Sequence, residues 1–307
     1  MPERICIVGC GAIGGLFAAH LARLADVEVW AYDRDRAHVD AINRDGLRLI
    51  GRTEVVASVN ARTDPADIPP CRFGIVATKG TVTEAAIVAT TPVFADDGAV
   101  CSVQNGIGNE ELIAARVTRV MRGVTLPASR VAAPGVIESD GHGLTWIGPF
   151  EPSPASLEEV QRLAGLLTRS GLQTRGVEDA RPAQWTKLLF NCATNPLCAL
   201  TGLTHGQLID HAPTRRLAEA VVEEGRAVAG ALGIVLEEDP LELVERLGRQ
   251  NYVHRPSMLQ DVTARRPTEI AQLNGGVVRA GRECGVPTPL NQAICDLVTG
   301  VEHGWLL

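Results

Sequence analysis

The feature that most constrains the fold of this chain is a glycine-rich segment close to its N-terminus. Three glycines spaced G-x-G-x-x-G follow the short apolar run 5–8 and lead directly into helix-forming residues, 15–24. In a strand–turn–helix unit, Gly9 permits the tight turn, Gly11 lets the backbone approach a phosphate, and Gly14 allows close helix packing. The segment therefore predicts a dinucleotide site.

The start of the following helix completes this predicted site. Its unpaired N–H groups and partial positive charge attract phosphate groups. We expect the cofactor to be bound by the loop residues Gly9, Cys10, Gly11, Ala12, Ile13 and Gly14.

An acidic residue stands where the second strand of such a unit should end. Asp33 follows the predicted strand 27–32. A carboxylate there accepts hydrogen bonds from the adenine ribose and repels a 2′-phosphate, which favours NAD. Arg34 and Arg36 follow at once, and an arginine can hold a 2′-phosphate, although both could simply be solvated loop charges. NAD is favoured, and NADP is not excluded.

Length, composition and charge limit the class of protein. A chain of 307 residues suggests about two domains. The net charge of −7 and the absence of a basic tract argue against nucleic acid or an anionic membrane as partner. No apolar run reaches the roughly 18 residues of a membrane span, and no signal-peptide pattern is present. The eight cysteines show no metal spacing. We expect a cytoplasmic protein without a metal site.

The pattern of predicted elements changes near residue 178. Before it, strands and helices alternate, which predicts a mostly parallel sheet covered on both faces. Within this part, the runs 135–139 and 144–147 predict a β-hairpin turned by residues 140–143. After it, only helices are expected, at 181–195, 214–232, 240–247, 257–264, 268–284 and 289–302. We predict a Rossmann-type dinucleotide-binding domain, 1–178, and an all-helical substrate and catalytic domain, 179–307, that closes over the cofactor.

Polar residues follow two of the predicted strands. Strand 73–78 ends at Lys79, and strand 99–103 ends at Gln104-Asn105-Gly106. Ligands of open α/β sheets bind beyond these carboxyl ends. Asn105 offers both a donor and an acceptor to a ligand. An ordinary turn would explain the same residues equally well.

The helical half contains a polar stripe in apolar surroundings. Lys187, Asn191 and Asn195 are four residues apart and share one face of a helix that Pro196 is expected to interrupt. This face predicts a polar cleft, although a lysine on a helix is more often simply solvated. Further along, Thr268 is a suitable N-cap and would place Glu269 in a first helical turn. There the carboxylate could interact with the helix dipole, or it could face Lys187.

Taken together, these segments resemble the ketopantoate reductase (2-dehydropantoate 2-reductase) family over essentially the whole chain. The resemblance rests on ordered motifs at the family's spacing: Gly9–Gly15, Lys79, Gln104–Glu110, Trp185–Leu188 with Asn191 and Asn195, Ser257–Asp261, Thr268–Ile270 and Leu273–Gly275.

The resemblance implies a fold, a reaction and residue roles. The fold is a Rossmann-type domain followed by a helical domain similar to the C-terminal domain of 6-phosphogluconate dehydrogenase. The reaction reduces a 2-keto acid to the (R)-2-hydroxy acid with NAD(P) as cofactor. Lys187 would be the general acid and Glu269 would orient it. Asn191, Asn195, Ser257 and Asn105 would bind the substrate, while Lys79, Asn105, Glu269, Asp33 and Arg34 would contribute to cofactor binding.

Two residues depart from the family pattern. Asp33 occupies the region where most members, which use NADP, have a basic residue, and Ala271 follows Thr-Glu-Ile where Asp is usual. An NAD-dependent 2-hydroxyacid dehydrogenase of the same family, acting on a mandelate-type or branched-chain keto acid, is therefore the alternative. A cofactor-binding protein without catalysis is a third reading. The apolar positions of the helical half could form a homodimer contact or simply the core.

Overall fold

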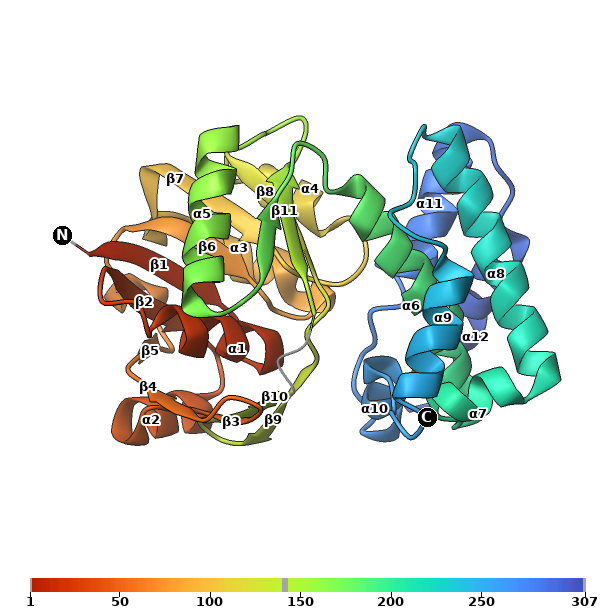
Figure 1. The fold of residues 1–307 in the computed structure, drawn as a ribbon, viewed down its shortest axis with the longest axis horizontal. Coiled ribbons are helices and arrows are strands. Elements are labelled where there is room, and N and C mark those ends of the chain that lie inside the picture. The colour runs from red at the N-terminus through yellow and green to blue at the C-terminus, as the bar shows by residue number, and fades with distance from the viewer. Residues whose placement is uncertain (1, 140–142, 306–307) are drawn as a thin grey trace. The chain divides into compact units, whose positions relative to one another are not determined.

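The computed structural model describes residues 2–139 and 143–305, and the chain separates into two compact units. The first comprises Met1–Gln104 and Asn109–Ala180, and the second Asn105–Gly108 and Arg181–Leu307. Figure 1 shows that the first unit contains the strands and that the second is helical. The predicted α/β architecture followed by helices is confirmed. Within the described ranges, no helix combines the length and apolar character needed to cross a lipid bilayer.

A mostly parallel sheet forms the centre of the first unit. Within the described residues its order is β12-β11-β8-β7-β6-β1-β2-β5, and β11 runs antiparallel to β8. Its strands are β1 (Glu3–Val8), β2 (Val27–Tyr32), β5 (Asn60–Arg62), β6 (Cys71–Val76), β7 (Phe94–Ser102), β8 (Val120–Thr125), β11 (Thr145–Pro149) and β12 (Thr174–Gly176).

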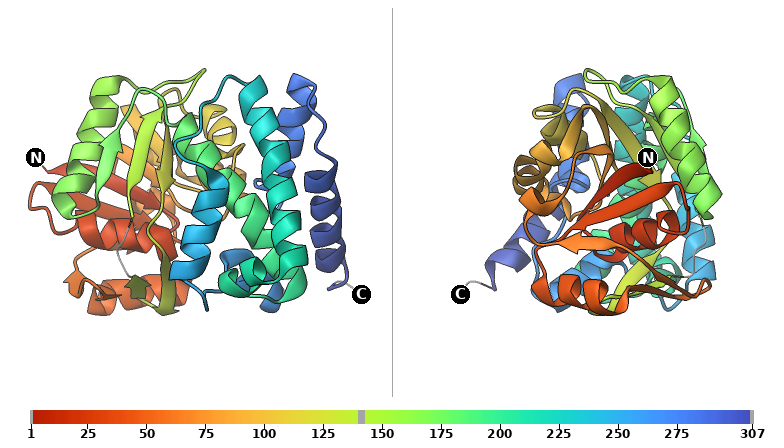
Figure 2. Two further views of the ribbon diagram at one scale, coloured as in Figure 1. Left: turned by 45° about the vertical axis from the view of Figure 1, so that its right-hand side comes forward. Right: turned by 90° about the vertical axis from the view of Figure 1, so that its left-hand side faces the viewer.

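Helices cover both faces of this sheet. They are α1 (Ala12–Leu21), α2 (Arg36–Asp45), α3 (Thr83–Thr90), α4 (Asn109–Ala114) and α5 (Leu157–Ser170). The sheet has a hydrophobic core on each face, because successive side chains of a strand such as β1 point to opposite faces. Ile5 and Ile7 join the core under α1 and α5, whereas Cys6 and Val8 join the core under α3 and α4. The two views of Figure 2 show α5 packed along the sheet.

A second, smaller sheet packs beside α1 and α2. Its order is β4-β3-β10-β9, with β3 (Leu47–Gly51), β4 (Val55–Ala57), β9 (Ser129–Ala133) and β10 (Val136–Ser139). The predicted hairpin between 135–139 and 144–147 is wrong, because β10 pairs with β9 while β11 pairs with β8 in the larger sheet. The turn at Pro134-Gly135, where Gly135 has φ +73°, closes the hairpin instead. Residues 140–142 of the predicted turn lie outside the described residues.

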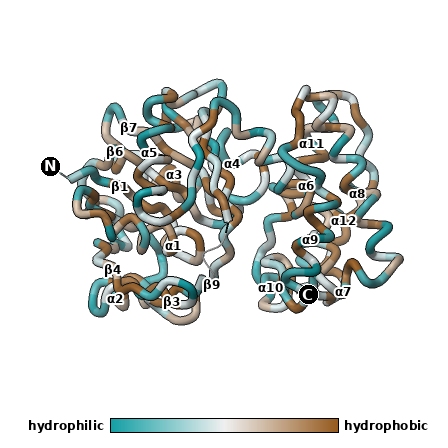
Figure 3. The backbone as a smooth tube through the Cα atoms, in the orientation of Figure 1, coloured by the Kyte–Doolittle hydropathy of each residue, from teal (hydrophilic) through white to brown (hydrophobic). Residues whose placement is uncertain are grey.

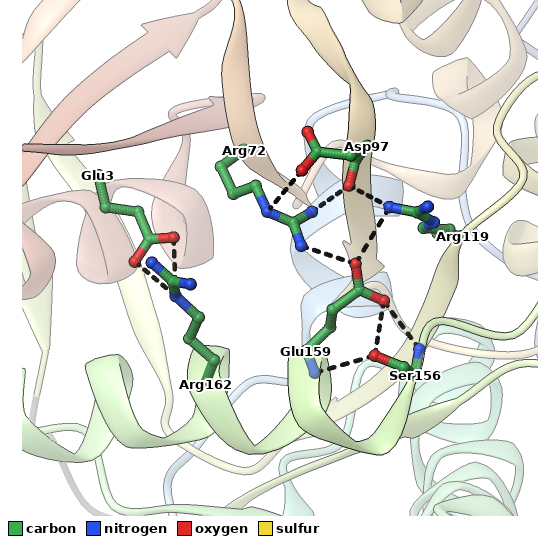
Figure 4. A network of polar contacts seen from close by, with 7 residues as sticks. All are labelled: Glu3, Arg72, Asp97, Arg119, Ser156, Glu159 and Arg162. Carbon is green, nitrogen blue, oxygen red and sulfur yellow. Dashed lines mark hydrogen bonds and ion pairs between the residues drawn. The ribbon is translucent and has the colours of Figure 1, made fainter.

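A polar network fastens the start of α5 to the sheet (Figure 4). Ser156 and Glu159 form a capping box that satisfies N–H groups at the helix start. Glu159 also accepts from Arg72 of β6 at 2.9 Å and lies 3.5 Å from Arg119. Burial raises the pKa of this carboxyl, but hydrogen bonds from Ser156 and Arg72 outweigh it and hold the pKa below its usual value. The helix start is therefore tied to strands distant in sequence.

The second unit is built around one long central helix. Helix α6 (Arg181–Thr201) is contacted by α7, α8, α9, α10 and α12. Figure 3 shows hydrophobic segments along α6 and its neighbours, which together form the core of this unit. The remaining helices are α7 (His205–Asp210), α8 (Ala212–Ala231), α9 (Pro240–Gln250), α10 (Ser257–Thr263), α11 (Asn274–Cys284) and α12 (Pro289–His303). The polar side chains predicted on α6 therefore project from a helix that packs against several others.

Candidate active site

The glycine-rich loop follows β1 and has the geometry that its spacing predicts. Gly9 has φ +88°, and a Cβ added there would lie 2.6 Å from the Thr78 side chain. A Cβ on Gly14 would lie 1.9 Å from the Gly9 carbonyl oxygen, so the turn itself requires glycine. Gly11 differs, because an added Cβ would meet nothing within 4 Å. No neighbouring atom excludes a side chain at position 11, and the open space there is suited to a ligand.

The start of α1 faces this open space without a side-chain cap. Gly11 is the N-cap residue and makes no side-chain hydrogen bond. The first backbone hydrogen bond runs from the Gly15 N–H to the Gly11 carbonyl at 2.7 Å, so the N–H groups of Ala12 and Ile13 precede the helical ladder. Unpaired N–H groups beside open space fit the pyrophosphate of a dinucleotide. The residues present therefore suit such a cofactor.

Asp33 lies beside the same loop. It directly follows β2, and its Oδ1 accepts a hydrogen bond from the Asp35 N–H at 3.0 Å. Burial raises the pKa of the Cys10 thiol, and the nearby charge of Asp33 raises it further. The carboxylate and the loop are thus electrostatic neighbours, while Arg34 is exposed.

The ends of β6 and β7 are joined by Gln104. Its amide nitrogen donates to the Thr78 carbonyl at 2.9 Å and to the Thr83 hydroxyl at 2.7 Å. Gln104 is buried, so it orders these loops, whereas Lys79 beside them is exposed. Lysine is rare in this chain, since Lys79 and Lys187 are its two lysines and the other basic residues are arginines.

In the second unit, α6 carries the predicted polar stripe. Lys187, Asn191 and Asn195 follow one another at single-turn intervals, and both asparagines are buried. The prediction that Pro196 interrupts the helix is wrong, because α6 continues to Thr201. Proline lacks the N–H that would bond the Cys192 carbonyl. The Asn274 side chain donates to that carbonyl instead, at 3.2 Å.

Asn105 belongs to this unit although it follows a strand of the first. The Ile107 N–H donates to the Gln272 carbonyl at 3.0 Å. Gly106 has φ +85°, and an added Cβ would lie 2.4 Å from the same carbonyl oxygen. The loop is thus held against residues 269–273. From it, Asn105 presents its Oδ1 to the Lys187 ammonium group, which donates at 2.7 Å.

Glu269 is buried in a turn before α11, so the prediction of a first helical turn is wrong. The backbone of Leu273, with ψ −104°, separates this turn from α11, which begins at Asn274. The Thr268 N–H donates to the Glu302 carboxylate at 2.8 Å, and the Leu273 N–H donates to the Glu269 carbonyl at 3.0 Å. Glu269 therefore does not lie in a first helical turn where it could interact with the helix dipole. It lies near enough to Lys187 to affect the pKa of that residue.

The electrostatics of Lys187 link these residues. Burial of its ammonium group lowers the pKa of Lys187 to about 8, and the charge of Glu269 partly opposes that shift. Burial disfavours the charged form, and a neighbouring carboxylate favours it. The structure thus brings Lys187, Asn105 and Glu269 together. Ser257 is half-buried at the start of α10, which packs against α6.

An aromatic row that begins at Phe190 of α6 has no signature in the sequence. The His205 ring lies 5.6 Å from the Phe190 ring and 5.1 Å from the His254 ring. His205 is buried, and its ring nitrogens have no hydrogen-bond partner among the described residues. Burial and then His254 lower the pKa of His205 to about 4, so this ring is neutral at pH 7. No local spacing connects these positions.

Known proteins match this chain along both units. The sequence pattern of ketopantoate reductase PanE/ApbA matches residues 5–152, and that of its C-terminal domain matches residues 179–302. The chain belongs to the ketopantoate reductase family. The 2-dehydropantoate 2-reductase of Archaeoglobus fulgidus is 32% identical over 98% of this chain and 99% of its own. That of Pyrococcus horikoshii is 33% identical over 97% of each chain.

Solved structures of ketopantoate reductase relatives share the fold. The crystal structure of a PanE/ApbA family ketopantoate reductase from Ralstonia eutropha matches with a TM-score of 0.90 and 30% identity, covering 99% of this chain and 100% of the other. A ternary structure of D-mandelate dehydrogenase with NADH and anilino(oxo)acetate matches with a TM-score of 0.91 and 25% identity, at the same coverage.

Proposed function

We propose that this chain reduces a 2-keto acid, 2-dehydropantoate, to the (R)-2-hydroxy acid, with Lys187 as the general acid. The observation that carries the proposal is the enclosed Lys187 ammonium group, hydrogen-bonded to Asn105 at 2.7 Å and accompanied by Glu269. A bound nicotinamide cofactor would supply the hydride. An ammonium group suits the remaining task, because it stabilises the developing alkoxide and can donate a proton to it.

The choice of lysine at this position supports the assignment. Twenty-seven of the 29 basic residues are arginines, since only Lys79 and Lys187 are lysines. A guanidinium group stays protonated and cannot act as a general acid near neutral pH. A lysine whose pKa is lowered to about 8 can lose and regain its proton there. In this proposal Glu269 keeps Lys187 charged and oriented.

The neighbouring polar groups supply substrate binding. Asn191 and Asn195 present amide groups from the same helix face as Lys187, and Ser257 adds a hydroxyl from α10. Amide and hydroxyl donors suit the carboxylate and hydroxyl oxygens of the acid. The glycine loop with Asp33, Arg34 and Lys79 would hold the cofactor.

The aromatic row of Phe190, His205 and His254 favours a second candidate of the same class. Aromatic rings attract aromatic ligands through stacked and edge-to-face contacts. A mandelate-type 2-keto acid, with an aromatic side chain, would use such a row. The similar D-mandelate dehydrogenase structure, a ternary complex with NADH and anilino(oxo)acetate, supports this alternative.

Initial rates with 2-dehydropantoate and with an aryl 2-keto acid, each with NADH and NADPH, test these proposals. We expect reduction of 2-dehydropantoate and preference for NADH, because Asp33 would repel a 2′-phosphate. Replacing Asp33→Ser should then improve the use of NADPH relative to NADH. Absence of turnover with every keto acid would contradict the proposal. Faster turnover of the aryl acid would favour the second candidate, and preference for NADPH would refute the role of Asp33.

A further inference from the structure

A buried histidine outside the predicted site contacts the glycine-rich loop. His38 lies in the first turn of α2 and is 4% exposed. Its Nε2 lies 2.9 Å from the Cys10 carbonyl oxygen, and its Nδ1 lies 3.1 Å from the Gly135 backbone nitrogen. One imidazole thus connects the loop after β1 with the turn between β9 and β10. The three segments are far apart in sequence.

The two contacts determine which ring nitrogen carries the hydrogen. The Gly135 N–H can only donate, so Nδ1 of His38 accepts. The Cys10 carbonyl can only accept, so Nε2 of His38 is protonated and donates to it. Both ring nitrogens of the buried His38 are satisfied in one tautomer.

This hydrogen bond controls the direction of the next peptide group. In a planar trans peptide, the carbonyl of Cys10 and the N–H of Gly11 point in opposite directions. Holding the Cys10 carbonyl toward His38 therefore aims the Gly11 N–H away from His38. Gly11 is the residue whose added Cβ would meet open space.

We propose that His38 is a positioning residue for the dinucleotide, acting through the Cys10–Gly11 peptide rather than by touching the ligand. The inference rests on the proposed function, because it assumes that this loop binds the cofactor's pyrophosphate. A correctly aimed N–H costs no reorganisation when the phosphate arrives, whereas a free peptide must be ordered at binding.

The position of α2 also connects His38 with Asp33, at the ribose end of the predicted site. Asp35, two residues after Asp33, caps α2 by accepting a hydrogen bond from the His38 N–H at 3.1 Å. Gly135 packs against the same face of the helix as His38, where an added Cβ would lie 3.0 Å from Ala41 Cβ. His38 therefore ties the loop to the turn that carries Asp33.

Two substitutions separate the contacts of His38. The amide of His38→Asn reaches the position of Nδ1, so it can accept from Gly135 but is too short for Cys10. The longer amide of His38→Gln reaches the position of Nε2 and can donate to Cys10. The matched control is His20→Leu. His20 is also 4% exposed, and its Nδ1 lies 2.9 Å from the Ser170 carbonyl oxygen, on a different loop.

The experiment measures NADH affinity by calorimetric titration, the thermal midpoint, and the separate KM values for NADH and keto acid. We expect His38→Asn to weaken NADH binding about tenfold, the scale of one lost buried hydrogen bond, with kcat at saturating NADH and the keto acid KM unchanged. His38→Gln should bind NADH nearly as the unaltered protein does. His20→Leu should lower the thermal midpoint without changing NADH affinity.

Other results overturn the inference. Equal NADH affinity in His38→Asn and the unaltered protein would do so, as would an affinity loss in His38→Gln as large as in His38→Asn. If His20→Leu lost NADH affinity in proportion to its drop in thermal midpoint, general destabilisation would explain weaker binding. His38 would then have only a structural role. A protein that binds NADH with this variant pattern but reduces no keto acid would remove the proposed function and leave the positioning role intact.

Discussion

The protonation of Lys187 leads to a quantitative prediction for the pH dependence of reduction. In the proposed mechanism only the charged ammonium group can donate the proton, and the pKa of Lys187 is lowered from 10.5 to about 8. Raising the pH from 7 to 9 should therefore reduce the protonated fraction from about nine-tenths to about one-tenth. For a lysine with the ordinary value, the same change would leave almost all of it protonated. We expect kcat/KM for reduction to fall about tenfold over this interval.

Replacing the neighbouring carboxylate tests the cause of the pKa. The charge of Glu269 raises the pKa of Lys187 against the larger effect of burial. Glu269→Gln removes this charge while keeping the size of the side chain and one acceptor oxygen. The alkaline limb of the kcat/KM profile should then move to lower pH, because the ammonium form loses its stabilising partner.

Nuclear magnetic resonance can measure the same pKa without turnover. A protein labelled with ¹³C in its lysines should give signals from two side chains, Lys79 and Lys187. Lys187→Arg assigns them and should reduce turnover by about two to four orders of magnitude, the range for lost acid–base catalysis. A Lys187 signal that titrates near 10.5, or a pH profile that Glu269→Gln does not move, would refute the reasoning.

Two further predictions concern the loop and the central helix. Gly11→Ala should leave the thermal midpoint nearly unchanged, because its Cβ meets open space. It should nevertheless weaken NADH binding about tenfold or more, because the methyl group would enter the proposed phosphate site. Gly165→Ala, also unobstructed but in α5, is the control, and equal NADH affinity in both variants would contradict the assignment. Asn274→Leu should lower the free energy of unfolding by about 1–3 kcal/mol, because the Cys192 carbonyl beside Pro196 loses its donor. Denaturant titration measures this, and unchanged stability would show that the carbonyl does not need Asn274.

Local patterns in the sequence predicted the elements that carry the site. The strand at Val27–Tyr32 coincides with the expected range, and the helices at Ser257–Thr263 and Pro289–His303 end within one residue of theirs. Hydrophobic periodicity and helix capping are local properties, so a short window of residues contains the signal. The apolar strand before the glycines and the four-residue spacing of Lys187 and Asn191 are likewise local patterns.

Other expectations failed where a distant residue decided the local structure. A proline normally ends a helix, but Asn274 supplies a hydrogen bond that keeps α6 continuous through Pro196. Thr268 is a good N-cap residue, yet the Glu302 carboxylate binds its N–H and the chain forms a turn instead. The hairpin expected around residues 140–143 was replaced by β9–β10, because β10 pairs in the second sheet.

The sequence by itself determined the strand–glycine–helix unit, the change from alternating elements to helices, and the polar face of α6, because each depends on neighbours a few residues apart. Only the tertiary structure decided that Asn105 joins the helical unit, 82 residues before Lys187 in the chain, and that Glu269 lies near enough to affect the pKa of Lys187. It alone connected His38 with Cys10 and with Gly135. Hydrogen bonds and charge interactions across such separations depend on how the elements pack, and packing has no local pattern in the sequence.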